Sequence, residues 1–297
     1  MENSSSICVE KPLWQQKLDT FIQNKLADPT SPHRKRWVER TQEYNSTHTK
    51  SIIEILRHEF QELRGLRLID WGCGSGLDSI TLARNGAMVT GVEMSAELVD
   101  IARLRAESEG VDVNFLTLDR DADWQRKEFY DVAIAVDVLE HVEEPNELFR
   151  KCKELLRPGG ILILTTPNRW AIQNIIADPH WQLFGVTLLP RALAEPYVTR
   201  VRRVLRQYDM TEFIGLRTMR GMLSKSDFVG LTDSAMDAEQ KLLAPAKVAS
   251  NAKRKLARML SRIASIRPLR WLFVWSYCYV FVRTWQVVAR KPERKTA

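Results

Sequence analysis

The stretch LRLIDWGCGSGLDS, residues 66–79, decides the fold of this chain. Its apolar run, typical of a buried strand, reaches Asp70, and three glycines then follow at alternate positions, Gly72, Gly74 and Gly76. Glycine has no Cβ, so a ligand can approach such a loop closely, and the amides that open the following helix attract negative groups. A strand, a glycine loop and a helix in this order predict a ligand-binding crossover rather than a plain tight turn.

Beyond this loop, short apolar runs alternate with amphipathic segments. Strands are expected at 66–71, 87–93, 111–118, 130–136, 161–166, 227–234 and 284–291, and helices at 77–86, 96–110 and 146–156. Ser95 is suited to cap the second of these helices. Strands alternating with helices predict an α/β fold, in which helices cover both faces of a parallel sheet.

Residues 167–225 are rich in Pro, aromatic residues and Arg, as in PNRW, DPHWQLFG and LLPRALAEPY. This composition fits neither a sheet strand nor a linker. Because the segment follows a central strand, it should lie over the carboxyl ends of the strands, where open α/β sheets bind ligands. We therefore expect a lid over the site.

The chain has 297 residues, 44% of them hydrophobic and 27% charged, as in an ordinary globular protein. Its four cysteines lie far apart without a CxxC pair, which indicates neither a disulfide framework nor a zinc site. The first residues do not resemble a secretory signal, and no run of apolar residues is long enough for a confident membrane span. A reducing, cytoplasmic setting is expected.

The net charge of +7 is concentrated near the C-terminus. Residues 247–297 contain 13 Lys and Arg and one acid, a net charge of +12, whereas the rest of the chain carries −5. A basic amphipathic segment, 251–266, precedes a 12-residue apolar and aromatic run, 271–282. This run is too short to cross a bilayer core of ~30 Å but suits a helix at an anionic interface.

We therefore expect residues 251–283 to contact an anionic membrane surface, peripherally on its inner face. The alternative is a helical hairpin packed on its own domain. No nucleic-acid partner is expected, because the aromatic residues adjoin aliphatic ones instead of alternating as a stacking platform.

The sequence also indicates which chemical class of ligand the glycine loop binds. A dinucleotide-binding GxGxxG loop needs Gly or Ala at its sixth position, where this chain has Leu77 or Ser79. Glu93 ends the next expected strand, 17 residues after Gly76, where a carboxylate can accept both hydroxyls of a ribose. The pattern favours a nucleoside with an appendage that is not a pyrophosphate.

The motifs DWGCGSG, VEMS, VLEHV and LRPGG resemble, in order and spacing, those of class I S-adenosylmethionine-dependent methyltransferases. The resemblance covers about residues 45–235 and includes ubiquinone-biosynthesis-type O-methyltransferases and methyltransferases of glycan and lipid pathways. It implies a Rossmann-like, seven-stranded, mostly parallel sheet with 284–291 as an antiparallel edge strand. The implied segments are N-terminal helices (1–62), a cofactor-binding core with its lid (63–235), a basic and aromatic helical insertion (236–283), and the edge strand with a tail (284–297).

The resemblance also implies the cofactor, S-adenosyl-L-methionine, and its contacts. Asp70 and the glycines would hold the methionine end, Glu93 the ribose, and Met94 would lie beside the adenine. An acid after the third strand would contact the adenine amino group; we assign it to Asp121, with Asp119 as the competing choice. The full expected set is Asp70, Gly72, Cys73, Gly74, Gly76, Glu93, Met94, Asp121 and Val138.

Methyl transfer to a hydroxyl needs a base, and His141 in DVLEHVEEP follows the fourth strand, at the mouth of the site. The alternative is a capping or core histidine. Asp137, Glu140 and His141 form D-x-x-E-H, a pattern that can ligate a divalent ion, but no second histidine follows at coordinating spacing. We predict no metal. His33, His48 and His58 are expected on the surface.

Substrate contacts are expected from the lid, at Arg169, Trp170, His180 and Trp181, with Arg191 and Tyr197 as further candidates. The expected activity is O-methylation of a small-molecule, lipid-linked or glycan acceptor at a membrane surface. Two other classes of function remain open: a non-catalytic membrane adaptor that keeps the nucleoside pocket, and a dinucleotide-dependent oxidoreductase. The sequence leaves the acceptor and the oligomeric state open.

Overall fold

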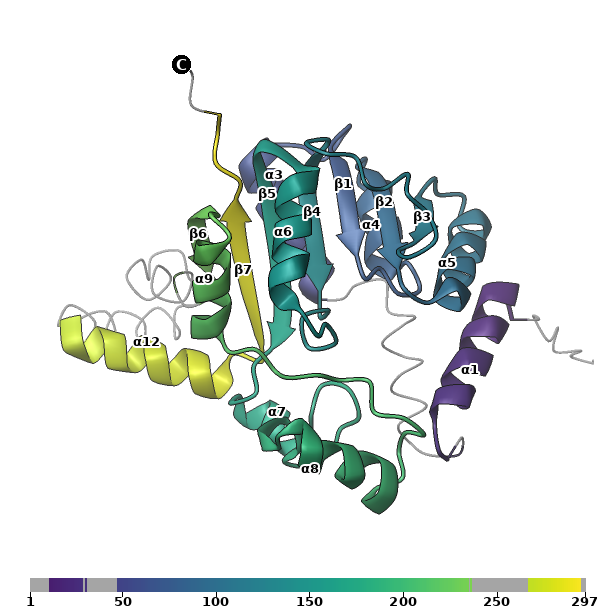
Figure 1. The fold of residues 1–297 in the computed structure, drawn as a ribbon, viewed down its shortest axis with the longest axis vertical. Coiled ribbons are helices and arrows are strands. Elements are labelled where there is room, and N and C mark those ends of the chain that lie inside the picture. The colour runs from purple at the N-terminus through teal and green to yellow at the C-terminus, as the bar shows by residue number, and fades with distance from the viewer. Residues whose placement is uncertain (1–10, 29, 31–46, 235, 237–266, 295–297) are drawn as a thin grey trace, which may run out of the picture.

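The computed structural model describes residues 11–28, 30, 47–234, 236 and 267–294. Its centre is a seven-stranded sheet in the order β3-β2-β1-β4-β5-β7-β6 (Figure 1). The strands are β1 (Arg67–Trp71), β2 (Met88–Glu93), β3 (Asn114–Thr117), β4 (Tyr130–Val136), β5 (Leu156–Pro167), β6 (Val229–Asp233) and β7 (Thr284–Arg290).

Neighbouring strands from β3 to β5 pair in parallel, and β7 is antiparallel to both β5 and β6. The predicted fold class is thereby confirmed, including an antiparallel strand at 284–290. One detail differs: β7 inserts between β5 and β6, so the edge strand on this side is β6.

Helices cover both faces of the sheet (Figure 1). They are α3 (Thr47–Phe60), α4 (Leu77–Arg84), α5 (Ala96–Ser108), α6 (Pro145–Leu155) and α9 (Leu216–Lys225), whereas α1 (Leu13–Lys25) packs on α5. Alternate side chains of β4 enter different apolar clusters: Ala133 joins the one beneath α6 and α9, and Val132 the one beneath α3 and α4. A strand buried on both sides explains why 130–136 is almost continuously apolar.

The helix boundaries follow from local sequence. The Ser95 hydroxyl accepts a hydrogen bond from the Leu98 amide, which caps α5 as expected. Helix α6 opens on Pro145, whose missing N–H costs nothing at a first helical position. It buries four side chains at helical spacing, namely Leu148, Phe149, Cys152 and Leu155.

The strand expected at 161–166 is longer than its sequence indicates, because PGG at 158–160 suits a turn. Strand β5 already begins at Leu156 and passes through both glycines. Gly159 has a φ of 75°, and the pairing with β4 shifts register between Tyr130 and Val132. A bulge of this kind accommodates the extra residues without ending the strand.

The expected lid lies over the carboxyl ends of the strands (Figure 1). Its short helices are α7 (Ile172–Ile176), η1 (Val186–Leu188), α8 (Arg191–Pro196) and η2 (Tyr197–Val201). Of these, η1, α8 and η2 share an apolar cluster with α1, in which Leu18 and Phe21 join Trp181 and Val198. Helix α9, which the sequence placed in the lid, packs instead into the main cluster beside the sheet.

Of the expected insertion, the structure describes Met236 and the residues from α12 (Arg267–Phe281) onward, so segment 251–266 lies outside the described residues. Val274 and Cys278 of α12 are buried against the main apolar cluster. Within the described parts of the chain, no helix has both the length and the hydropathy that a bilayer span requires. The division into four segments stays a prediction.

Candidate active site

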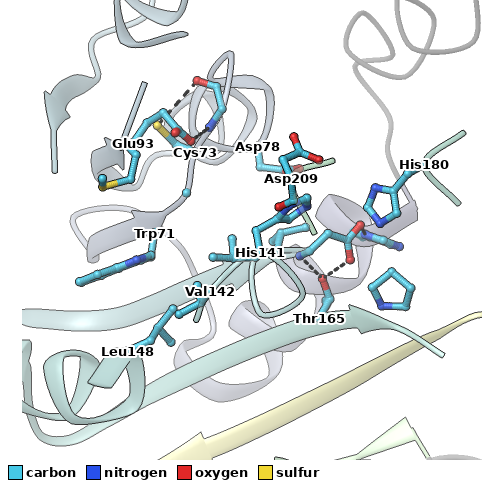
Figure 2. Close-up of a pocket in the computed structure, with 18 of the residues that line it drawn as sticks. Trp71, Cys73, Asp78, Glu93, His141, Val142, Leu148, Thr165, His180 and Asp209 are labelled. Atoms are coloured by element: carbon cyan, nitrogen blue, oxygen red, sulfur yellow. Dashed lines mark hydrogen bonds and ion pairs between the residues drawn. The ribbon is translucent and has the colours of Figure 1, made fainter. Parts of the chain in front are cut away.

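A cavity of about 1640 Å³ lies at the carboxyl ends of β1, β2, β4 and β5. Figure 2 shows Glu93 and Cys73 at one end of it and His180 at the other, with His141 between them. The glycine loop and the ends of the strands form the first end. The lid, with residues of α1 and α3, forms the second.

The glycine loop turns back on the sheet as it leaves β1. The amides of Gly72 and Cys73 both donate to the Val92 carbonyl, at 2.8 and 3.1 Å. Gly72, Gly74 and Gly76 all have positive φ, from 54° to 81°. Side chains are therefore disfavoured at all three positions by backbone conformation alone.

The surroundings of the three glycines differ. A Cβ on Gly72 would lie 2.6 Å from Val138, and one on Gly76 would lie 2.7 Å from Phe115. A Cβ on Gly74 would meet nothing within 4 Å, and Gly74 lines the cavity. Gly72 and Gly76 are thus required by packing, whereas Gly74 leaves backbone open to a ligand.

Glu93 lies where the sequence placed it, at the end of β2 and facing this loop. Its carboxylate accepts hydrogen bonds from the amides of Gly74, at 3.2 Å, and Ser95, at 3.0 Å. Met94 beside it is 60% exposed and also lines the cavity. The adjacent Cys73 is buried, which raises the pKa of its thiol and keeps it neutral.

Asp70 does not line the cavity but supports the loop from beneath. It is buried, and its carboxylate accepts a hydrogen bond of 2.5 Å from the Ser79 hydroxyl of α4. Burial raises the pKa of Asp70 to about 7, and the nearby charge of Asp78 adds to the effect, while the Ser79 hydrogen bond opposes it. The expected role of Asp70 at the methionine end is thus one of holding the loop.

The two candidates for the adenine contact are separated by the turn after β3. The Asp121 carboxylate is directed back toward the strand, where it accepts a 2.6 Å hydrogen bond from the Thr117 amide. Asp119 lines the cavity, and Asp121 does not. This geometry favours Asp119 over the first choice, because Asp121 is engaged in closing the turn.

His141 lines the cavity on a turn that follows β4, beside Val138. Its Nδ1 lies 3.1 Å from the Asp209 carbonyl of the lid. A carbonyl can only accept, so Nδ1 carries a proton, and in the neutral imidazole Nε2 then keeps its lone pair. The lid is held there because the Thr211 amide donates to the Glu140 carbonyl at 2.7 Å.

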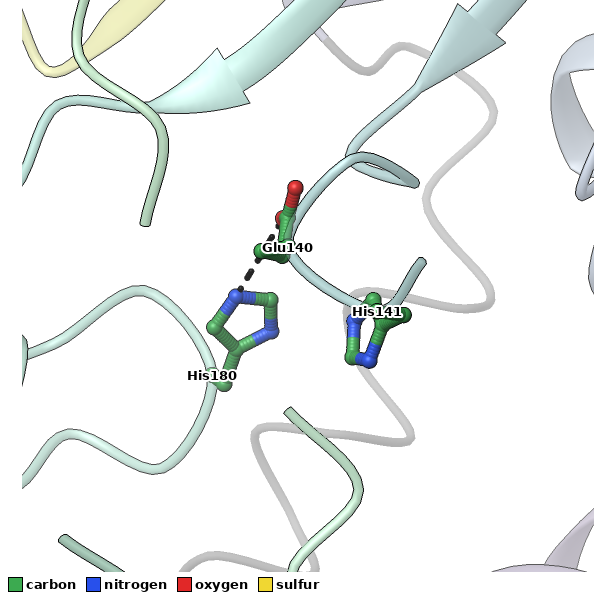
Figure 3. A group of neighbouring side chains, drawn as sticks. All are labelled: Glu140, His141 and His180. Atoms are coloured by element: carbon green, nitrogen blue, oxygen red, sulfur yellow. Dashed lines mark ion pairs between the residues drawn. The ribbon is translucent and has the colours of Figure 1, made fainter. Parts of the chain in front are cut away.

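The D-x-x-E-H residues do not converge. Asp137 turns toward Thr165 and His48, and its carboxylate lies 3.6 Å from Nδ1 of His48. The lid instead brings His180 to Glu140 and His141, so that one ligand atom of each lies within 4.8 Å of the others (Figure 3). No local spacing signals this approach, and the absence of a metal stays a prediction.

Glu140 is fully buried. Its carboxylate accepts a hydrogen bond from Thr166 at 3.1 Å and lies 3.5 Å from Nε2 of His180. The His180 ring also meets that of His141 edge to face, at 5.6 Å between ring centres. One carboxylate and two imidazole groups therefore lie close together at the second end of the cavity, which the lid forms.

The expected substrate residues divide into two groups. His180 and Trp181 line the cavity, and Trp181 packs against Tyr208. Arg169 instead lines a separate cavity of about 300 Å³ together with Arg191. Trp170 lines neither of these cavities and is 51% exposed.

Sequence reasoning missed the N-terminal helices as part of the site. His48, expected on the surface, lines the cavity from the first turn of α3, and Ser51 of the same helix bonds to Gln286 of β7. Leu18, Phe21 and Lys25 of α1 line it as well. The local sequence of α1 and α3 does not indicate a place on the cavity, because it is the lid that brings α1 and the sheet together.

The comparisons with known proteins agree with this geometry. A family model described as a methyltransferase domain matches residues 37–230. A ubiquinone biosynthesis O-methyltransferase of Coxiella burnetii (strain Dugway 5J108-111) is 38% identical over 107 residues, which cover 36% of this chain and 46% of that protein. That of Stutzerimonas stutzeri (strain A1501) is 28% identical over 219 residues, covering 72% of this chain and 88% of the relative.

The chain thus spans about half the length of the first of these relatives. Among solved structures, a putative sarcosine dimethylglycine methyltransferase from Galdieria sulphuraria is 14% identical, with a TM-score of 0.49 over 88% of each chain. A Haemonchus contortus phosphoethanolamine N-methyltransferase 2 in complex with S-adenosyl-L-methionine is 18% identical, with a TM-score of 0.48 over 82% of this chain and 53% of that one.

The family match covers well over half of the chain, including the glycine loop, Glu93 and His141. It confirms the methyltransferase family that the sequence motifs imply. The chain belongs to the methyltransferase-domain family.

Proposed function

We propose that this protein transfers a methyl group from S-adenosyl-L-methionine to a hydroxyl of a small-molecule, lipid-linked or glycan acceptor at a membrane surface. The observation that carries the proposal is the two-ended cavity. Open backbone at Gly74 and the Glu93 carboxylate form one end, the lid with His180 forms the other, and His141 lies between them (Figure 2).

The residues present at the first end fit a sulfonium nucleoside. Gly74 leaves space for the methionine end, Glu93 can accept the ribose hydroxyls, and Asp119 can accept from the adenine amino group. Met94 and Val138 supply apolar contacts. Such a carboxylate can hold the ribose of a nucleoside or of a dinucleotide, and it is Leu77 or Ser79 at the sixth loop position that argues against a pyrophosphate.

The bound donor supplies an electrophilic methyl group on a positively charged sulfur. The protein must hold the acceptor oxygen about 3 Å from that carbon and in line with the bond that breaks, which can contribute ~7–11 kcal/mol. His141 Nε2 takes the hydroxyl proton as the oxygen attacks, and its Nδ1–H remains bonded to the Asp209 carbonyl.

The acceptor end of the cavity suits a partly apolar molecule. Trp181 of the lid, with Leu18 and Phe21 of α1, lines the cavity there. The matched relatives named as ubiquinone biosynthesis O-methyltransferases support a hydroxyl acceptor. An acceptor of this kind is concentrated in membranes, which agrees with peripheral contact through 251–283 and its basic, aromatic composition.

Transfer is tested with donor labelled in its methyl group, incubated with membrane extract and the full chain. We expect labelled lipid-phase product and release of the demethylated donor, S-adenosylhomocysteine. Binding of the donor without any release of this product would instead identify a non-catalytic adaptor. Protection from thermal unfolding by NAD, with none by S-adenosylmethionine, would support the oxidoreductase alternative.

A further inference from the structure

The large apolar side chains that remain exposed are concentrated in two parts of the described chain. Of seventeen such residues, seven lie in the lid between Trp170 and Val201, and five lie on α12. Each is 38% to 70% exposed. Single exposed apolar residues are ordinary, whereas a cluster of this size marks an interaction surface.

Helix α12 has two distinct sides. Val274 and Cys278, one turn apart, are buried against the protein. Trp271 and Trp275, also one turn apart, stack on each other at 6.2 Å and are 67% and 46% exposed. Tyr and Trp side chains at the outer side of a helix settle well at the boundary between lipid headgroups and acyl chains.

The lid and α12 form one unit. Helix α7 packs against α12, and Figure 1 shows α12, α7 and α8 along the same end of the molecule. The fully buried Asn168 donates to the carbonyls of Cys278, Tyr279 and Val282 near the end of α12. Asn174 of α7, also buried, donates to the Arg283 carbonyl at 2.7 Å.

These bonds satisfy carbonyls that the end of a helix leaves without partners. They also fix α7 beside α12, so that Ile172 and Ile176, 45% and 59% exposed, extend the apolar side of α12. Helices α7 and α12 therefore present one surface, which we call the apolar face and from which the rest of the lid continues (Figure 1).

The exposed charge of the lid is mostly positive. Arg191, Arg200, Arg202 and Arg203 of the lid are exposed, and Glu195 is the one exposed acid between residues 170 and 203, all of which the structure describes. Apolar side chains bordered by cations match an anionic bilayer, into which the former insert while the latter approach the headgroups.

We propose that the lid and α12 together dock on an anionic bilayer, and that the junction of α7 and α12 opens the cavity toward the lipid. Asn174 and Arg283 at this junction line the cavity, as does Val282. A lipid-dissolved acceptor can then reach His141 without crossing water. The route of the acceptor depends on the proposed methyl transfer, whereas the docking does not.

Docking is tested by flotation of the full chain with vesicles of phosphatidylcholine containing 30% phosphatidylglycerol. Two double variants probe the two parts: Ile172→Ser with Ile176→Ser in α7, and Trp271→Ser with Trp275→Ser in α12. The matched control is Leu13→Ser with Met88→Ser, which changes apolar residues 56% and 62% exposed elsewhere on the surface. Binding of S-adenosylhomocysteine by calorimetry checks that each variant is folded.

We expect both variants of the apolar face to partition about tenfold less than the parent, and the control to partition as the parent does. Binding should also fall with added salt and on pure phosphatidylcholine. Parent-like flotation of the α7 variant would overturn the proposal, because the lid would then lie outside the face. The proposal would also be overturned if the parent did not bind vesicles but formed a dimer that the same variants dissociate.

The route of the acceptor is tested with labelled donor and membrane extract. The α7 variant should methylate intact membranes several-fold more slowly than the parent but match it after detergent solubilisation. An equal loss in both preparations contradicts the route, since the substitutions would then act on the cavity itself. If the parent labels nothing in either preparation, the proposed function fails, while flotation still decides the docking.

Discussion

The two ends of the cavity are built in different ways. At the donor end, Gly72, Gly74 and Glu93 lie within 22 residues of one another, and backbone amides and one carboxylate supply the contacts. At the acceptor end, His48, His141 and His180 come from three distant segments, and the lid and N-terminal helices bring them together. The donor end can therefore be recognised from a local motif, whereas the acceptor end exists only in the folded chain.

The largest effect is expected from His141→Ala, which should lower methyl transfer while leaving binding at the donor end unchanged. Loss of a general base lowers turnover of labelled donor about 10²–10⁴-fold, while calorimetric affinity for S-adenosylhomocysteine should stay at the parent value. His58→Ala, on an exposed residue of α3, is the control. Turnover by the His141 variant at the parent rate would remove this residue from the mechanism.

Asp70→Asn tests the support of the donor end through pH. The pKa of Asp70 is about 7 in the folded protein, against an ordinary value of 3.8. Between these two pH values the folded protein keeps a proton that the unfolded chain has released. The stabilisation from this proton is therefore fully present below pH 3.8 and is lost as the pH rises toward 7. The parent should lose up to about 1.4 kcal/mol of unfolding free energy per pH unit relative to the variant, which cannot titrate there. Urea unfolding at pH 4, 5.5 and 7.5 measures this, and parallel profiles would contradict it.

Gly72→Ala should show that the loop is required by packing as well as by conformation. Its Cβ would lie 2.6 Å from Val138, whereas Gly110, with a similar φ of 64°, has nothing within 4 Å. Gly110→Ala therefore measures the conformational strain alone. We expect Gly72→Ala to lower the unfolding free energy by about 1–3 kcal/mol more than Gly110→Ala. Equal losses would mean that Val138 can move aside.

The smallest effects should distinguish the two acids after β3. Asp119→Asn removes a carboxylate from the cavity wall, so affinity for S-adenosylhomocysteine should fall about tenfold, as for one charged hydrogen bond. Asp121→Asn weakens only the turn that closes on the Thr117 amide, so it should change stability and leave affinity near the parent value. The opposite pattern of affinities would restore Asp121 as the adenine contact.

Much of the fold could be predicted from the sequence because its cues are local. The strand runs, the glycine loop and the Ser95 cap each depend on neighbouring residues, and the structure contains all three. The path through Gly159 was misread because two glycines after a proline also suit a turn. Only pairing with β4 shows that they form a bulge within a strand.

The same distinction applies to the site. Glu93 and Val138 follow strand ends, so their places on the cavity could be predicted. The engagement of Asp121 by the Thr117 amide, and the approach of His180 to Glu140, are set by tertiary contacts with no periodic signal. Likewise, the sequence predicts that the Trp170 ring contacts the substrate, yet this side chain lies exposed on the lid.

Binding of the methyl donor should depend most on Glu93 and the open backbone at Gly74, and calorimetry with S-adenosyl-L-methionine tests both directly. The full chain should bind the donor saturably, one molecule per chain. Glu93→Ala should weaken binding at least about tenfold, through loss of a charged hydrogen-bond acceptor, whereas Glu97→Ala, on an exposed residue of α5, should leave it unchanged. No binding by the parent, or equal binding by parent and Glu93→Ala, would contradict the assignment of this cavity to the methyl donor.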